Sequence, residues 1–130
     1  MLYSILFCAC SSRERTETSF LQAESLLEEH PDSALQLLQT LPALQELSHK
    51  ESARYALLLA RATDKCEKSL LPCDSLLNLA LNYYDNDEKE RAVALLYKGR
   101  LEIEINSTKE AIAHLQEALT ILKNYPKEIE

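Results

Sequence analysis

The sequence predicts an all-α protein of about six helices, paired as three antiparallel hairpins. From Thr16 onward the apolar residues recur three and four positions apart, which is the spacing of one helix face. The 130 residues include one glycine and four prolines, whereas sheets and catalytic loops depend on glycine for positive φ and close backbone approach. With 46% hydrophobic and 27% charged residues, the composition is that of one soluble globular domain rather than a disordered chain.

The first ten residues form an apolar run, MLYSILFCAC, that ends at Cys10. The run is too short to span about 30 Å of hydrocarbon as a helix, which takes about 20 residues. It resembles the end of a bacterial lipoprotein signal peptide, in which a small residue precedes the lipidated cysteine, as Ala9 precedes Cys10. Residues 1–10 are then a signal remnant, residues 11–15 a polar linker, and the protein lies in the periplasm or at a membrane surface, held only by its lipid. The alternative is the hydrophobic first turn of a helix in a cytoplasmic protein.

Residues 16–41 are expected to form the first hairpin. An apolar stripe that includes Phe20 ends before Pro31, because proline stops a helix. Asp32 is predicted to cap a second, short helix, which Pro42 ends.

Residues 48–84 are expected to form the second hairpin. Ser48 and Glu51 have the spacing of a capping box, in which the serine side chain accepts from the N3 amide and the glutamate reaches back. The helix that follows is apolar on more than one side, so it is expected to lie between neighbours. Asp74 opens the second helix of the pair.

Residues 88–124 are expected to form the third hairpin, with helix starts at Asp87 and Ser107. The alternation LEIEI at 101–105 would suit a strand, but it continues a helical pattern and has no partner strand elsewhere in the sequence. We therefore assign it to the last turns of the first helix. Glycine inside a helix costs roughly 1 kcal/mol relative to alanine, so Gly99 is expected to mark a close helix crossing.

The third hairpin resembles the tetratricopeptide repeat (TPR), and the second is a looser copy. In that family a large and a small apolar residue stand four apart on the first helix, and alanines stand seven apart on the second with a bulky residue between. The positions that match, and that the resemblance assigns to repeat packing, are Leu95, Gly99, Ala111, Leu115 and Ala118, with Ala60 in the second hairpin. Glu102 departs from the pattern, because an aromatic residue is common there. The resemblance implies one domain at 16–124 whose hairpins stack as a right-handed solenoid.

More narrowly, the order of segments such as HPDSALQLLQTL and EAIAHLQEALTILK is similar to the periplasmic TPR regions of Bacteroidetes lipoproteins and membrane-anchored regulators. In many such relatives further repeats are followed by a transmembrane helix and an output domain. Residues 125–130 are then a tail that fits a truncation point, and further repeats or an output domain would be missing from this chain.

A TPR array presents a concave surface built largely from the first helix of each hairpin. The groove positions that the resemblance implies are Arg54, Leu57, Arg61 and Lys65 on the second hairpin and Leu96, Arg100 and Glu104 on the third. Arg61 and Arg100 hold equivalent places, so two guanidinium groups are expected to hold a carboxylate of a bound peptide. The alternative is that these are solvated charges that pair along their own helix, as Arg100 with Glu104.

Four cysteines, at positions 8, 10, 66 and 73, lack the CxxC spacing of a zinc site. In an oxidising compartment a disulfide between Cys66 and Cys73 would close the loop between the helices of the second hairpin. The alternative is two unpaired, small apolar residues, since the sequence does not give the Cα separation that a bridge requires.

Motifs for catalysis, cofactor binding or metal binding are missing. The three histidines fall on different elements, and HExxH, a nucleophile elbow and a phosphate-binding glycine loop are absent from the sequence. A net charge of −7 disfavours nucleic-acid binding. The sequence thus predicts a non-catalytic scaffold without cofactor or metal that binds a protein or peptide, as an envelope lipoprotein or the sensory segment of an envelope signalling protein. The alternatives are a cytoplasmic adaptor and an architectural segment, the latter favoured if Ile112, Leu115, Leu119 and Leu122 form an exposed face.

Overall fold

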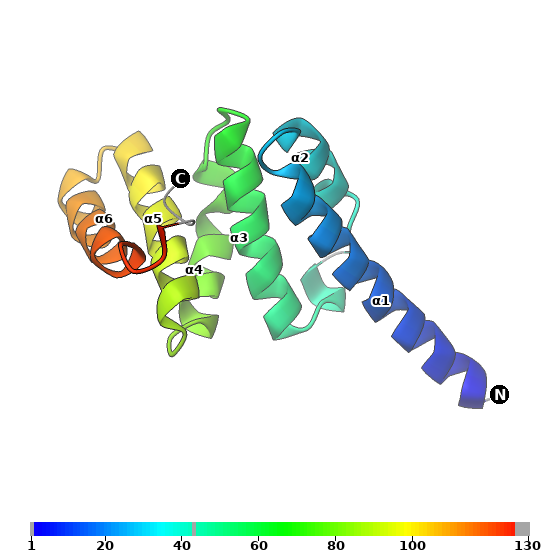
Figure 1. Ribbon diagram of the computed structural model, residues 1–130. Helices are drawn as coiled ribbons and strands as arrows, with labels where there is room; N and C mark the ends of the chain where they lie inside the picture. The colour runs from blue at the N-terminus through cyan, green and yellow to red at the C-terminus, as the bar shows by residue number, and fades with distance from the viewer. Residues whose placement is uncertain (1, 43, 127–130) are drawn as a thin grey trace.

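The computed structural model describes residues 2–42 and 44–126, with side chains from residue 13 onward within those ranges. This part of the chain is all-helical, as predicted. Its elements are α1 (Leu2–Leu26), α2 (Pro31–Gln39), α3 (His49–Lys65), α4 (Asp74–Tyr83), α5 (Glu88–Glu104) and α6 (Thr108–Leu122), with short 3-10 turns η1 (Leu44–Glu46) and η2 (Leu71–Cys73). Consecutive helices pack as α1 with α2, α3 with α4, and α5 with α6, and Figure 1 shows these three pairs in a row.

The segment 11–15, expected as a polar linker, is part of α1, which runs without interruption from Leu2 to Leu26. Its residues include Arg13, Glu14 and Arg15, which are good helix formers, and no Gly or Pro precedes Pro31 in the chain. None of the helices in the described ranges is both long and apolar enough to cross a membrane. The side chain of Cys10 and residues 127–130 lie outside the described residues, so lipidation and the tail stay predictions.

The capping signals hold at α3 and α5, whereas Ser107 precedes α6 without a side-chain cap hydrogen bond. The capping box of α3 is complete: Glu51 N donates to Ser48 Oγ at 3.1 Å, and Ser48 N donates to the Glu51 carboxylate at 2.9 Å. At α5, Asp87 Oδ1 accepts from the backbone N–H of Glu90 at 3.1 Å. The prediction of Asp32 as the cap of α2 is wrong, because Pro31 takes the first helical position and moves Asp32 into the first turn.

Two helices end in left-handed residues that are not glycine. Glu67 (φ 56°) follows α3 and Asn106 (φ 62°) follows α5. In each case the next residue closes the helix with a backbone hydrogen bond, from Lys68 N to the Thr63 carbonyl at 3.1 Å and from Ser107 N to the Glu102 carbonyl at 2.8 Å. This is the Schellman arrangement, in which glycine is the usual residue because it has no Cβ.

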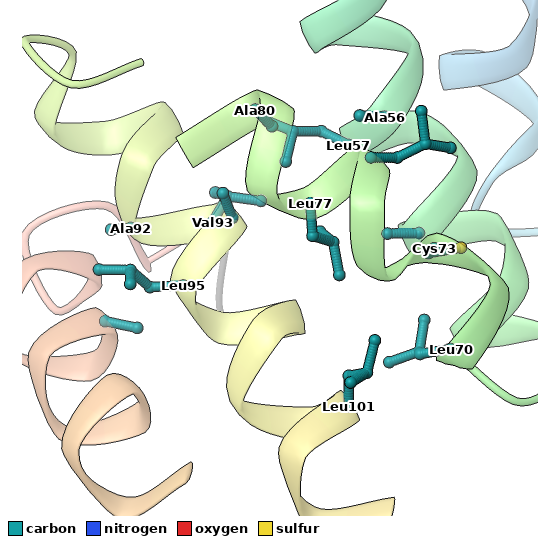
Figure 2. Close-up of a cluster of buried hydrophobic side chains, with 14 of the residues drawn as sticks. Ala56, Leu57, Leu70, Cys73, Leu77, Ala80, Ala92, Val93, Leu95 and Leu101 are labelled. Carbon is teal, nitrogen blue, oxygen red and sulfur yellow. The ribbon is translucent and has the colours of Figure 1, made fainter. Parts of the chain in front are cut away.

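The apolar core has two parts, and α3 contributes to both. One cluster lies between α1, α2 and α3, and takes Leu58 and Ala62 from α3. The larger cluster joins the second and third hairpins, and Figure 2 shows Leu57 of α3 and Leu77 of α4 among its members. Because opposite sides of α3 enter different clusters, α3 holds the N-terminal hairpin to the rest of the protein.

Gly99 lies where α5 and α6 cross closely. A Cβ added to Gly99 would lie 2.6 Å from Cγ and 2.8 Å from Cδ2 of Leu115, closer than real side-chain contacts. Of the six residues expected in repeat packing, Ala60 is on α3 and the other five lie on α5 and α6. Five of the six are buried and Leu115 is half-buried; the buried ones are Ala60, Leu95, Gly99, Ala111 and Ala118. The segment 101–105 is helical up to Glu104 and is not a strand.

Candidate functional site

The first helices of the three hairpins, α1, α3 and α5, meet around a small pocket of about 310 Å³. Its lining combines charged and apolar side chains: Glu24 of α1, Arg54, Leu57, Leu58 and Arg61 of α3, and Lys89, Glu90 and Val93 of α5. The volume is at the lower end of the range for ligand pockets, about 300 to 1,000 Å³. Such a pocket suits one side chain of a larger partner. We call it the α1/α3/α5 pocket.

A row of ion pairs joins α1 to α3 beside this pocket. Both helices carry charged residues spaced first seven and then four positions apart: Glu17, Glu24 and Glu28 on α1, and Arg54, Arg61 and Lys65 on α3. Arg54 donates from Nη1 to both carboxylate oxygens of Glu17 at 2.8 Å, and from Nη2 to Glu24 at 3.3 Å. Lys65 Nζ lies 3.0 Å from Glu28. We call these six residues the α1–α3 ladder.

Arg54 is fully engaged within the protein. Burial lowers its pKa, but the hydrogen bonds and charges of Glu17 and Glu24 outweigh this effect and raise it. Its guanidinium also lies 5.1 Å from the centre of the buried Phe20 ring, which is a cation–π contact. The positive charge of Arg54 is therefore neutralised before any ligand arrives.

Arg61, in the middle of the ladder, differs from its neighbours. In the part of the chain that the structure describes, no carboxylate lies within ion-pair distance of it, because Glu24 turns to Arg54 instead. Arg61 lies near Tyr97, whose pKa is raised by burial, a rise that the Arg61 charge opposes. Arg61 thus presents a cation to the pocket without a carboxylate to match it.

Arg100 does not join Arg61 in the pocket. It pairs with Asp64 of α3 at 2.9 Å, so the expected pairing along the helix with Glu104 is wrong. The pKa of Asp64 is raised, chiefly by burial, and the nearby Arg100 works against this rise. Arg61 lines the pocket and Arg100 does not, so the clamp of two guanidinium groups stays a prediction, in which a ligand would have to compete with Asp64 for Arg100.

Glu104 holds the loop between α3 and α4 rather than lining the pocket. Its carboxylate accepts from Ser69 Oγ at 2.7 Å and from the backbone N–H of Leu70 at 2.9 Å. Leu96, also expected in the groove, packs half-buried against the larger core cluster. These contacts connect segments more than thirty residues apart and no local spacing rule reveals them.

Of the seven predicted groove residues, only Arg54, Leu57 and Arg61 line the pocket. On α5 the pocket is lined by Lys89, Glu90 and Val93, about two turns before the positions that the resemblance implies. The pocket thus lies on the same helix as the implied groove but nearer the start of that helix. Which part of α5 faces the pocket depends on how α5 packs against α3, and the sequence carries no local signal for that packing.

Of the two alternatives for Cys66 and Cys73, the unpaired one is observed, because both are free thiols. Cys73 is buried in the larger core cluster and lies 3.9 Å from Thr63 Oγ1, whereas Cys66 packs against the N-terminal cluster. Burial is the main reason why the pKa of each thiol is raised. Both sulfur atoms are therefore protonated at neutral pH and poorly nucleophilic.

A histidine and a carboxylate meet inside the third hairpin. Glu102 of α5 is only 6% exposed, and its two oxygens lie 3.0 and 2.8 Å from Nδ1 of His114 on α6. Glu102 thus departs from the repeat pattern because His114 supplies its partner. Within the described ranges, no group of three His, Cys, Asp or Glu side chains gathers to hold a metal ion.

Compared with protein-family models, with curated proteins and with solved structures, the chain has no match. A function for it has to come from the chemistry of its own surface.

Proposed function

We propose that the chain is a non-catalytic, TPR-like helical-repeat scaffold that binds an acidic segment of a protein or peptide in the α1/α3/α5 pocket. The observation that carries this proposal is Arg61, a pocket cation that has no carboxylate within ion-pair distance among the described residues, although Glu24 and Glu90 line the same pocket. Guanidinium binds a carboxylate through two parallel hydrogen bonds, which are among the strongest in proteins.

The surroundings of Arg61 favour such an interaction. Leu57, Leu58 and Val93 line the same pocket and are at most 5% exposed, so one wall is backed by the apolar core. A charge pair beside such a wall is less screened than a pair in open water. The bound acid would take the place beside Arg61 that Glu24 leaves vacant when it turns to Arg54.

The test uses two pools of fluorescein-labelled hexapeptides that differ only in carrying glutamate or glutamine. We expect the glutamate pool to bind more tightly, with an affinity that falls as salt is raised. Arg61→Ala should weaken its binding about tenfold or more, since it removes a charge-assisted hydrogen-bond pair. Lys68→Ala, which removes an exposed lysine outside the pocket, is the matched control. Equal binding by wild type and Arg61→Ala would contradict the proposal.

We further propose that this scaffold is an envelope lipoprotein anchored through Cys10. The support is the apolar run that ends in Ala9-Cys10. Intact mass of the protein expressed in a bacterial envelope with its native upstream DNA tests this directly. A membrane form that begins at a lipidated Cys10 is expected, and a soluble form that retains Met1 would instead place the scaffold in the cytoplasm as an adaptor.

A second candidate function is architectural, namely contact with another helical hairpin of the same kind. It is favoured by Ile112 and Leu119 on α6, which are 51% and 47% exposed. Only part of the expected face is exposed, because Leu122 is buried and Leu115 is half-buried against Gly99. Sedimentation velocity tests it: self-association that disappears in Ile112→Lys with Leu119→Lys would support the architectural role, and a monomer at all concentrations would count against it.

A further inference from the structure

A second, larger cleft lies away from the α1/α3/α5 pocket, between η1, the start of α3 and the outer face of α4. Its volume is about 920 Å³. On α3 it is lined by His49 and Ser52, which lie roughly 160° around the helix from the α3 residues of the smaller pocket, at 100° per residue. The two sites are therefore on opposite sides of α3.

The cleft lies beside the segment that follows α2, a helix of nine residues. Pro42 follows soon after the end of α2 at Gln39, and η1 rather than a longer helix lies beside α4. The face of α4 that carries Asn78 and Asn82 points away from the core, since Leu77 and Ala80 occupy the opposite, buried side. The α4 side chains that line the cleft thus remain accessible.

The chemistry of this cleft is opposite to that of the smaller pocket. None of the described residues that line it is Asp, Glu, Lys or Arg, although charged residues make up 27% of the chain. Three of its polar side chains are amides, those of Gln45, Asn78 and Asn82, and no described residue accepts from or donates to these three side chains. Each amide offers both a donor and an acceptor, as a peptide group does. Such a surface favours an uncharged ligand with the same two functions.

The spacing of the amides fits an extended polypeptide. Asn78 and Asn82 stand four residues apart on α4, which is about 6 Å along the helix. Alternate residues of an extended chain repeat at about 6.6 Å, so two peptide groups on one side of it can reach both amides. Leu79 and Tyr83 form a parallel apolar row, and Tyr83 is 44% exposed. This second row can pack against the side chains of the same ligand.

We propose that this amide-lined cleft binds an extended, uncharged polypeptide segment, so that the protein holds two different segments on opposite sides of α3. Asn78 and Asn82 hydrogen-bond the backbone of the segment, and Leu79 and Tyr83 contact its apolar side chains. This site is independent of the acidic ligand proposed for Arg61.

A library of random heptapeptides displayed on phage, selected on the whole chain, provides the probe. We expect selected peptides to contain a run without Asp, Glu, Lys or Arg. The synthetic versions should lose at least tenfold in affinity on Asn78→Ala with Asn82→Ala, because two backbone hydrogen-bond partners disappear. Both asparagines are exposed and helical, and alanine is the better helix former, so this variant folds. Asn86→Ala, in the turn after α4, is the matched control and should bind as wild type does.

Three outcomes would overturn the inference. One is recovery of no binding peptide, and another is equal binding by wild type and the double asparagine variant. The third is binding that Arg61→Ala abolishes or that salt weakens strongly, since that would place the peptides in the α1/α3/α5 pocket. The third outcome would support the proposed function while rejecting the second site, so the two proposals fail separately.

Discussion

The two ends of the protein hold their helices together by different means. At the N-terminal end, α1 meets α3 through the α1–α3 ladder, whose carboxylates Glu17, Glu24 and Glu28 are 56%, 42% and 67% exposed. At the C-terminal end, α5 meets α6 through Gly99 against Leu115 and through Glu102, which is 7% exposed in its side chain, with His114. The ladder is exposed and charged, whereas the middle of the α5–α6 crossing is close-packed and largely buried, although a more exposed ion pair, Arg91 with Glu117 at 2.7 Å, joins the same two helices.

This difference determines at which junction a ligand can replace contacts of the protein. Exposed ion pairs contribute roughly 0 to 1 kcal/mol, so a ligand carboxylate can replace one of them at little cost. Leaving a buried carboxylate without its partner costs free energy of folding. Side chains at a close helix crossing are tightly packed and have little room to shift. The N-terminal junction is therefore suited to exchange partners, and the C-terminal junction to hold a fixed shape.

The largest effect is expected from His114→Ala, which leaves Glu102 buried without its partner. We expect a loss of about 2 kcal/mol in the free energy of unfolding, measured with urea. His30→Ala, at an exposed position without a side-chain cap bond, should change it by less than about 0.5 kcal/mol. Replacing both partners with leucine should recover most of the loss. A His114→Ala variant as stable as wild type would show that this junction is not dry.

A smaller loss, of about 1 kcal/mol, is expected from Gly99→Ala. The added methyl group forces Leu115 to move, at roughly 1 to 3 kcal/mol, while alanine returns about 1 kcal/mol of helix propensity. A double-mutant cycle with Leu115→Ala checks the cause. Truncation of Leu115 should cost less in the Gly99→Ala protein than in wild type, and additive effects would mean that the two residues do not clash.

At the other junction, Glu24→Gln should cost less than about 1 kcal/mol of stability. It should also raise the affinity for acidic peptides about threefold, because the ligand carboxylate then competes with one fewer carboxylate of the protein for Arg54 and Arg61. Fluorescence titration against the Glu29→Gln protein, altered at an exposed residue near the end of α1, isolates the effect. Unchanged affinity would mean that the ladder does not compete with the ligand.

The smallest effect concerns Asp64, whose pKa in the folded protein is raised above 3.8 by burial. The folded protein then binds a proton more readily than the unfolded chain, so Asp64 stabilises the fold fully below about pH 4, and this contribution is lost as pH rises through the folded pKa. As pH rises through the folded pKa of Asp64, the free energy of unfolding of the wild type should therefore fall relative to that of the Asp64→Asn protein. Urea unfolding from pH 3 to pH 7 measures it, and parallel curves for the two proteins would reject the assignment.

The fold was largely predictable because its signals are local. Pro31 and Pro42 bound α2, Ser48 with Glu51 starts α3, and the helical spacing correctly outweighed the strand-like alternation at 101–105. The misses on the fold concern α1, whose residues 11–15 continue the helix, and the cap of α2. At residues 11–15 the helix propensity of the side chains outweighs their polarity. At α2 the position of Pro31 outweighs the capping preference of Asp32.

The candidate site was less predictable because the residues that pair there are far apart in the sequence. Glu17 meets Arg54 across 37 residues and Asp64 meets Arg100 across two hairpins, so no rule for neighbours along one helix could pair them. Arg61, expected in the groove, lines the α1/α3/α5 pocket, and Glu24, which faces it on α1, pairs with Arg54 instead, which no sequence rule indicates. The amide-lined cleft was missed entirely, since no motif on α4 indicates it.

The separation of contacts along the chain also sets the order in which the protein folds. Glu102 and His114 are 12 residues apart, whereas the Glu17 contact to Arg54 closes 37 residues. Closing the longer loop costs about 1 kcal/mol more in chain entropy, so we expect the contact between Glu102 and His114 to form before that between Glu17 and Arg54. The residues of the α1–α3 ladder nevertheless leave the ribosome before α5 and α6, which follow them in the sequence. During synthesis, the ladder therefore emerges before the helices whose contacts close the shorter loop.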